Sequence, residues 1–258
     1  MTETRMEARV VAAGRGWRWL AEGYGLFRKN PVMWLALTML LAALWAVSFI
    51  IPVLGPLLFN LLSPALFAGL MLGCRALENG EPLEIAHLFA GFKRQAAPLV
   101  TVGGVYLVGT VVVVGIVLLV AGGSNIPAVL SKQEADVEAL RAAARSMAFA
   151  FAVGAVVYLP LLMLIWFAPM LVVFRELPPV AAMKFSFTAC VANTAPFLVY
   201  GVAILLAWFV LSLPAALGAI GSVLVIALFV ASIPVLICSV YASYQDIFAE
   251  CPPAAPVP

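Results

Sequence analysis

The chain has 258 residues, of which 65% are hydrophobic and only 10% are charged, with a formal net charge of +2. A soluble globular domain carries about 25% charged residues, so this composition excludes a single water-solvated domain and indicates a surface that faces lipid. The small net charge, without a long basic run after residue 30, gives no indication of a nucleic-acid partner.

A helix is expected over residues 16–29, inside a basic N-terminal segment. It places aromatic and aliphatic side chains on one face and charged side chains on the other. The apolar face holds Trp17, Leu20, Tyr24 and Phe27, and the charged face holds Arg15, Arg18, Glu22 and Lys29. Such a helix is typical of a segment that lies in the headgroup plane of a membrane. Because apolar spans follow it directly, we interpret the N-terminus as a retained segment and not as a cleavable signal.

Six apolar segments follow, each long enough to cross a bilayer as a helix. They cover residues 31–51, 56–74, 97–120, 147–174, 195–213 and 218–245. The short links at 51–56 and 211–214 predict antiparallel hairpins. Pro160 and Pro169 in the fourth segment, and Pro234 in the sixth, predict kinks or local unwinding.

Two more amphipathic helices are expected, over residues 83–94 and 180–191. Each short helix ends at a polar residue, and Pro31, Pro98 or Pro196 then opens the next span. Proline suits the first turn of a helix because its missing N–H needs no partner there. We therefore predict an all-α membrane protein with six transmembrane helices arranged as three hairpins, each preceded by a cytoplasmic interfacial amphipathic helix.

The repeat divides a single integral membrane domain, residues 1–258, into units of approximately 14–77, 78–175 and 176–249. An insertion on the outer side, residues 122–146, carries a capping box of Ser131 and Glu134 and is expected to begin a helix that continues into the fourth span. It would cover the outer end of the bundle or meet a partner there. Residues 250–258 are expected to be a flexible tail.

The basic residues predict the orientation of the chain. Most of them fall in segments 1–30, 75–96 and 175–194, whereas the opposite side keeps Lys132, Arg141 and Arg145. We therefore expect a multi-pass protein of a bacterial inner membrane with both termini in the cytoplasm.

The short helices have two interpretations. In one they only anchor and orient the hairpins. In the other they form a platform that contacts anionic lipid headgroups, a partner in a membrane complex or a second copy of the chain, because basic residues are attracted to an anionic leaflet. The candidate contact residues are Arg15, Trp17, Arg18, Trp19, Arg28, Lys29, Lys93 and Arg94.

The spans contain essentially no ionisable residues, which disfavours a proton-coupled transporter or an ion pump. Asn60 and Ser63 beside Pro64, together with Pro160 and Pro169, are candidates to line a small cavity. Hydrogen bonding between helices is the other explanation for these mildly polar positions.

Nothing in the sequence indicates a catalytic, cofactor or metal site. Hydrolase, metalloprotease, P-loop and dinucleotide motifs do not occur. The single histidine, His87, falls on the polar side of a short helix. The cysteines have no paired spacing, so we interpret them as free thiols; they are Cys74, Cys190, Cys238 and Cys251.

Several stretches resemble an uncharacterised family of proteobacterial inner-membrane proteins. They are GRGWRWL at 14–20, IPVLGP at 51–56, SPALFAGL at 63–70, ENGEP at 78–82 and HLFAGF at 87–92. More distantly, the plan of helix plus hairpin is similar to the membrane domain of some glycerophosphodiester phosphodiesterase fusions. Their catalytic domain is missing here, so the resemblance implies a location and an architecture but neither an activity nor site residues.

These observations favour a non-enzymatic inner-membrane protein that acts through lipid or protein contacts, as a scaffold, an accessory subunit or a lipid-handling helper, with no cofactor. The alternative is a permease or exporter for an apolar or amphipathic solute, with a path beside Asn60, Pro64, Pro160 and Pro169.

Overall fold

A computed structural model of the chain describes residues 8–122 and 137–248, which form helices joined by short turns, with no strand among them. The elements are α1 (Arg15–Lys29), α2 (Pro31–Ser48), α3 (Leu54–Glu78), the 3₁₀ helix η1 (Ile85–Phe89), α4 (Ala90–Gly122), α6 (Val137–Ile165), α7 (Ala168–Arg175), α8 (Pro179–Ala192), α9 (Thr194–Ser212), the 3₁₀ helix η2 (Leu213–Leu217) and α10 (Ala219–Phe248).

Six helical segments among the described residues are long and apolar enough to cross a membrane, and each overlaps one of the predicted spans. They are Pro31–Ser48, Leu54–Glu78, Ile85–Ala121, Arg141–Arg175, Thr194–Leu217 and Ala219–Phe248. Their outward side chains are apolar and exposed, among them Val108, Leu119 and Leu205. Lipid is the medium that tolerates such a surface, because it has the same polarity as these side chains.

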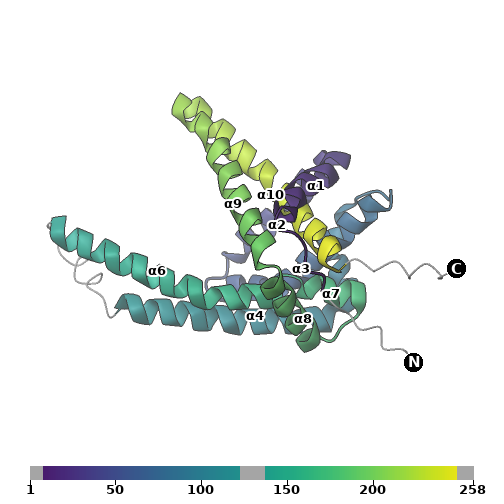
Figure 1. Cartoon of the computed structure of the whole chain (residues 1–258), viewed down its shortest axis with the longest axis horizontal. Coiled ribbons are helices and arrows are strands. Elements are labelled where there is room, and N and C mark those ends of the chain that lie inside the picture. The colour runs from purple at the N-terminus through teal and green to yellow at the C-terminus, as the bar shows by residue number, and fades with distance from the viewer. Residues whose placement is uncertain (1–7, 123–136, 249–258) are drawn as a thin grey trace.

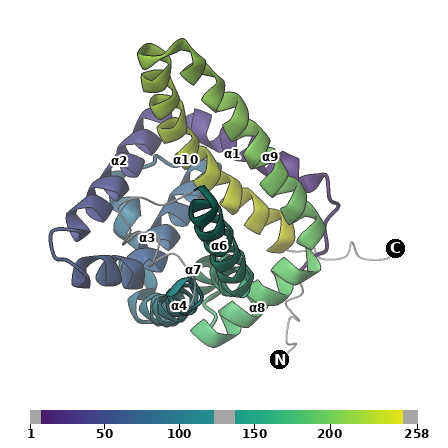
Figure 2. The same cartoon turned by 90° about the vertical axis from the view of Figure 1, so that its left-hand side faces the viewer.

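The long helices diverge from one end of the molecule (Figures 1 and 2). Helices α4 and α6 lie side by side and point away from a common region in one direction, and α9 and α10 point away from it in another. In this region α1 and α7 meet the C-terminal ends of α3 and α10, and α8 packs against α6 and α7. We call it the base. The largest fully buried side chains of the base include Trp19, Phe167 and Tyr241.

Helix α1 packs backbone to backbone against α9 and α10. A Cβ added to Gly16 would overlap the carbonyl oxygen of Pro196, and a Cβ added to Gly23 would overlap the backbone of Ser239. Trp19 lies between these glycines on the same face and is fully buried. The apolar stripe expected from the sequence is divided: Trp17 and Tyr24 are exposed, whereas Leu20 and Phe27 are partly buried and pack against the core.

A polar residue interrupts the helix before each of the three prolines that open a span. Asn30 has φ −153° and ψ 72° and directly precedes Pro31. Gln95 has φ −148° and ψ 53° inside α4, three residues before Pro98. Asn193, with φ −113° and ψ 30°, separates α8 from α9. Proline disfavours helical backbone in the residue before it, which explains the break at Asn30.

The fourth span is interrupted, and a serine on α8 bonds to backbone groups that the interruption leaves unpaired. Helix α6 ends at Ile165 and α7 begins at Ala168, beside Pro169, which has no N–H to bond back to Ile165. The Ser186 hydroxyl accepts a hydrogen bond from the Phe167 N–H at 2.9 Å and donates one to the Met163 carbonyl at 2.6 Å. The unwinding also expected at Pro160 and Pro234 is absent, because both lie inside uninterrupted helices.

Helix α8 and the start of α6 correspond to two further predicted helices. The face of α8 that packs on the protein is built from Ala182, Met183, Ser186, Ala189 and Cys190, whereas Val180 and Val191 are exposed. Helix α6 runs from Val137 into the fourth span, as predicted. The capping box at 131–134 and the tail at 250–258 lie outside the described residues.

Candidate functional site

Asp246 of α10 ties the N-terminal helix to the base. Its Oδ2 accepts a hydrogen bond from Arg15 Nε at 2.6 Å and another from Trp19 Nε1 at 2.9 Å. Arg15 also pairs with Glu22 at 3.0 Å. The hydrogen bond with Asp246 raises the pKa of the Arg15 guanidinium above its ordinary value, so this cation stays charged and bound. These contacts fix the angle at which α1 lies against α10.

A second cluster of polar side chains lies around the C-terminal end of α3. Glu78 accepts hydrogen bonds from the Tyr241 hydroxyl at 2.6 Å and from Gln245 Nε2 at 2.9 Å. Lys29 Nζ donates to the carbonyl oxygen of Leu77 at 2.9 Å. Because the last carbonyls of a helix have no partner within it, Lys29 stabilises the end of α3.

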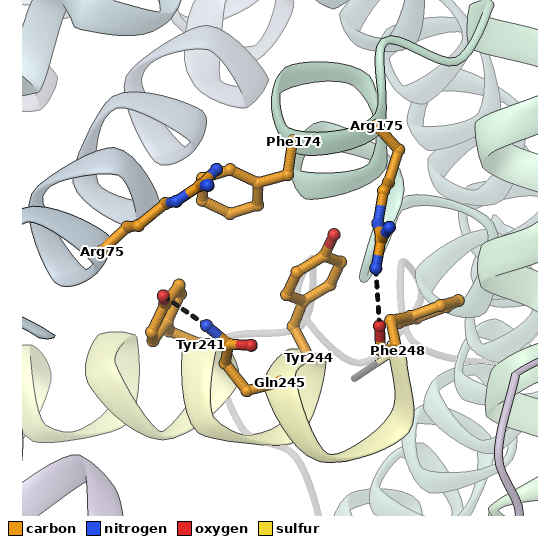
Figure 3. Close-up of a pocket in the computed structure, with 7 residues that line it drawn as sticks. All are labelled: Arg75, Phe174, Arg175, Tyr241, Tyr244, Gln245 and Phe248. Carbon is orange, nitrogen blue, oxygen red and sulfur yellow. Dashed lines mark hydrogen bonds between the residues drawn. The ribbon is translucent and has the colours of Figure 1, made fainter. Parts of the chain in front are cut away.

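A pocket of about 330 Å³ opens between α3, α7 and α10 and is bounded by two arginines (Figure 3). Its lining is Arg75, Phe174, Arg175, Tyr241, Tyr244, Gln245 and Phe248. The Arg75 guanidinium lies 5.3 Å from the centre of the Phe174 ring. Arg175 Nη2 donates to the carbonyl oxygen of Phe248 at 2.9 Å. None of the described lining residues is acidic.

Two neighbouring pockets have mixed charge. One, of about 400 Å³, is lined by both cations and carboxylates of the base, including Arg15, Lys29, Glu78 and Asp246. The other, of about 340 Å³, places Arg75 and Arg94 beside Glu81 and His87. Arg75 therefore lines both this pocket and the pocket between α3, α7 and α10.

The structure divides the candidate contact residues into two groups. Trp17, Arg18, Arg28, Lys93 and Arg94 are exposed. Trp17 exposes 60% of its surface, so it is available to a membrane or a partner. The Arg28 guanidinium lies 5.8 Å from the centre of the Tyr24 ring, on the same exposed side of α1.

The other candidates have structural partners. Trp19 is fully buried, and its ring contacts Phe197 and Tyr200 at centroid distances of 5.3 and 5.8 Å. Arg15 is held by Asp246, and Lys29 by the end of α3. Trp19 therefore does not belong to the exposed face. The partners that bury it are far away in sequence, Asp246 by 227 residues, so no local pattern could have identified them.

The candidate cavity residues are only partly brought together. An apolar pocket of about 300 Å³ is lined by Ser63, Pro64, Phe67, Tyr106, Leu162, Ile165, Trp166, Pro169 and Val240. Asn60 and Pro160 do not line it. Trp166 lies at the break in the fourth span, and its indole nitrogen is buried without a hydrogen-bond partner in the part of the chain that the structure describes.

Sequence analysis missed the arginine pocket because Arg75 and Arg175 were read only as topology signals. Each one directly follows the end of a predicted span, but nothing in the sequence around either arginine shows that the two line one pocket. Among residues 8–122 and 137–248, no group of three or more His, Cys, Asp or Glu side chains could hold a metal ion. Cys74, Cys190 and Cys238 are free and buried, and burial raises the pKa of the Cys190 thiol to about 12.

The chain is similar to a probable inner membrane protein of Burkholderia thailandensis, with 34% identity over 271 aligned residues that cover 97% of each protein. No family model matches the chain, so its likeness to the membrane domain of the phosphodiesterase fusions gains no support. No solved structure matches it either. With six candidate transmembrane helices and a relative aligned over nearly the whole length, the chain belongs to the family of this probable inner membrane protein.

Proposed function

We propose that the protein binds anionic lipid headgroups of the cytoplasmic leaflet through its base, without catalysing a reaction, and so acts as a scaffold, an accessory subunit or a lipid-handling helper. In this proposal both termini lie in the cytoplasm. The distribution of charge supports it: Arg75, Arg94 and Arg175 lie at the base, whereas Arg141 and Arg145 lie toward the far end of α6.

In the same proposal, α1, the segment from η1 to Gln95, and α8 lie along the membrane surface, and each introduces one hairpin. The backbone breaks at Asn30, Gln95 and Asn193 support this arrangement because each one allows the chain to turn from the surface into the bilayer. In this proposal the same three joints mark the beginnings of the hairpins in the three repeat units.

The exposed face of α1 is the observation that carries the proposal. Trp17, Arg18, Tyr24 and Arg28 are exposed, while Trp19 and Arg15 fix the opposite side of the helix to α10. A tryptophan and two arginines held in this way suit the boundary between headgroups and acyl chains. Each basic residue near an anionic leaflet contributes about 1 kcal/mol of binding free energy.

The test is the lipid that is purified with the protein. The triple variant W17A/R18A/R28A would be extracted in native-lipid particles, and the ratio of anionic to zwitterionic lipid would be measured by mass spectrometry. We expect this ratio to fall several-fold relative to the unchanged protein. The matched control is R141A/R145A/F149A, which removes two exposed arginines and an exposed aromatic residue from α6. Equal lipid ratios in the triple variant and the unchanged protein would contradict the proposal.

The apolar pocket beside Trp166 favours a second candidate function, transport of an apolar or amphipathic solute. Its buried indole N–H could donate to an ester or hydroxyl oxygen of such a solute. The variant S63F would fill the pocket, and V108F, on the exposed surface of α4, is its control. The measurement is the apolar compound that is purified with each variant. Its loss from S63F but not from V108F would support transport, and its absence from the unchanged protein would dismiss it.

A further inference from the structure

We propose that two turns of the protein are lipid anchors, seated where acyl chains meet headgroups in the leaflet opposite the base, and that neither emerges into the water beyond. The first turn, residues 48–55, joins α2 to α3, and the second, residues 212–221, joins α9 to α10. We call them the α2–α3 turn and the α9–α10 turn. The inference goes beyond the proposed function, because it holds whichever side of the membrane the base faces.

Both turns lie in the middle of long uncharged stretches. No Asp, Glu, Lys, Arg or His occurs between Lys29 and Arg75, or between Lys184 and Asp246. The side chains that the turns expose are large and apolar, and they include Phe49, Ile50, Val53, Leu217 and Ile220. Ile50 exposes 75% of its surface and Ile220 exposes 83%. Acyl chains match such side chains in polarity, whereas water does not.

The serine hydroxyls at the two turns donate to backbone groups of their own helices. Ser48 Oγ donates to the carbonyl oxygen of Trp45 at 2.6 Å, and Ser212 Oγ donates to the carbonyl oxygen of Phe209 at 2.7 Å. A polar group that is bonded within the protein does not need water as a partner, so these serines are compatible with a lipid environment.

Each turn also folds a glycine onto a backbone carbonyl. A Cβ added to Gly55 would overlap the carbonyl oxygen of Ser48, and a Cβ added to Gly221 would overlap the carbonyl oxygen of Pro214. In both turns the carbonyl belongs to the residue seven positions before the glycine. The carbonyl lies against the glycine backbone and is shielded there. Such a closed turn suits lipid, which cannot bond to exposed backbone groups.

The lengths of α2 and α9 limit how far the turns can reach. The two helices have 18 and 19 residues, which makes them about 27 and 29 Å long. The hydrocarbon core of a bilayer is about 30 Å thick, so an upright helix of this length only just crosses it. Since α9 and α10 point in a different direction from α4 and α6, not all of the long helices can be upright (Figures 1 and 2). Tilt shortens the depth that a helix reaches.

A tryptophan lies one turn before the far end of each of these helices. Trp45 precedes the end of α2 at Ser48, and Trp208 precedes the end of α9 at Ser212. Both tryptophans are exposed on the surface of the protein. Tryptophan is enriched where acyl chains meet headgroups, so these two residues hold the turns at that depth.

The far ends of α4 and α6 have the opposite character. Residues 96–122 of α4 follow the break at Gln95 and are about 40 Å long, which exceeds the hydrocarbon thickness. Near the start of α6, Glu138 pairs with Arg145 at 3.2 Å and with Arg141 at 3.8 Å, and each side chain is 71–73% exposed. Exposed charges are costly in hydrocarbon, so this end emerges into water.

The test uses the full-length protein with C251S, in lipid nanodiscs that leave both membrane surfaces open. The variants I50C and I220C place a nitroxide spin label on the two turns, and V137C places it on the exposed start of α6 as the matched control. The other cysteines, Cys74, Cys190 and Cys238, are buried and should not take up the label. Electron paramagnetic resonance would measure collisions of each label with oxygen, which concentrates in lipid, and with a nickel chelate, which stays in water.

We expect the ratio of oxygen to nickel collisions to be several-fold higher for I50C and I220C than for V137C. Equal ratios at the three positions would show that the turns reach water and would overturn the inference. Few collisions with either reagent at the turns would show that protein, such as a second copy of the chain, covers them, and would also overturn it. All three positions are exposed, so the variants should keep the fold.

A glycine variant tests whether the closed turn keeps water out. G221A adds a Cβ where the Pro214 carbonyl lies, so I220C/G221A should collide more often with the nickel chelate than I220C. The matched control is I220C/G201A on the same pair of helices, because nothing lies within 4 Å of a Cβ added to Gly201. Equal collision rates in the two double variants would refute this role of Gly221. The lipid ratio of W17A/R18A/R28A does not enter these measurements, so the proposed function and this inference can fail separately.

Discussion

Asp246 makes the two hydrogen bonds that hold α1 on the base. Its carboxylate binds Arg15 and Trp19 and is largely shielded, with 16% of its side chain exposed. Replacing it by asparagine removes the charge that both donors face. A hydrogen bond to a charged group contributes about 1.5–3 kcal/mol, so D246N should lower the free energy of unfolding by about 2 kcal/mol.

Thermal unfolding followed by tryptophan fluorescence would measure the effect of D246N. The matched control is E138Q, which removes the carboxylate of the exposed pair between Glu138 and Arg145 at 3.2 Å. Exposed ion pairs contribute little, so the control should unfold at nearly the temperature of the unchanged protein. Equal shifts in the two variants would show that the Asp246 bonds have no special role.

Ser186 satisfies both backbone groups freed by the break in the fourth span. S186A would leave the Phe167 N–H and the Met163 carbonyl without this partner in a fully buried position. An unsatisfied buried polar group costs about 1–3 kcal/mol, and S186A should lose at least that much stability. T188A is the control on the same helix, because the Thr188 hydroxyl is exposed and bonds only to carbonyls of its own helix. A stability loss no larger than that of T188A would refute the role of Ser186.

The described cysteines should be unreactive in the folded protein. Cys74, Cys190 and Cys238 are buried, and the Cys190 thiol, with its pKa raised to about 12, remains protonated at pH 8. Since the thiolate is the reactive form, a C251S variant should take up maleimide only after denaturation. Mass spectrometry before and after denaturation measures this, and rapid labelling of the native variant at pH 8 would contradict the burial of all three.

Helix α1 depends on two glycines for its close approach to α9 and α10. G23A places a Cβ against the Ser239 backbone, so α1 must move away from α10. G25A is the matched control on the same helix, because nothing lies within 4 Å of its added Cβ. Alanine is favoured over glycine inside a helix by about 0.5–1 kcal/mol, so G25A should leave stability unchanged or raise it.

G23A should therefore lower the unfolding temperature, whereas G25A should leave it unchanged or raise it. Limited trypsin digestion would report the detachment of α1, since Arg18 and Arg28 lie on its exposed side. Equal digestion rates and equal unfolding temperatures would show that α1 does not rely on this contact.

The elements of this fold were far easier to predict than its contacts. Each span is a continuous apolar run, and Pro31, Pro98 and Pro196 mark where three of the spans begin, so hydropathy and local chemistry were sufficient. The sequence predicts a kink or unwinding at each of three prolines, and the helix breaks at Phe167, beside Pro169. Ser186, which bonds to the freed Phe167 N–H, lies on another helix, so the local sequence could not show which proline breaks its span. Trp19 looked like a surface residue because its partner, Asp246, is near the other end of the chain. The arginine pocket joins α3, α7 and α10 and has no local sequence signature.

At the scale of the molecule, the proposed orientation places the base in the cytoplasm. Green fluorescent protein fused after residue 258 should therefore fluoresce, because it folds in the cytoplasm. Alkaline phosphatase inserted in the outer segment, after residue 128, should be active, because it requires the oxidising periplasm. If the fluorescent protein were dark and the phosphatase inactive, the base would lie on the periplasmic side. The proposal that the base binds lipids of the cytoplasmic leaflet would then fail.

The long helices diverge from the base, so a small rotation of a helix within the base moves its far end by a larger distance. Helix α10 has 30 residues, which at 1.5 Å per residue makes an arm about 45 Å long. A tilt of about 5° about the C-terminal end of α10, inside the base, would move its N-terminal end by about 4 Å, by the same helix geometry. Small movements among α1, α7 and α10 in the base would thus produce larger displacements at the far ends of the long helices.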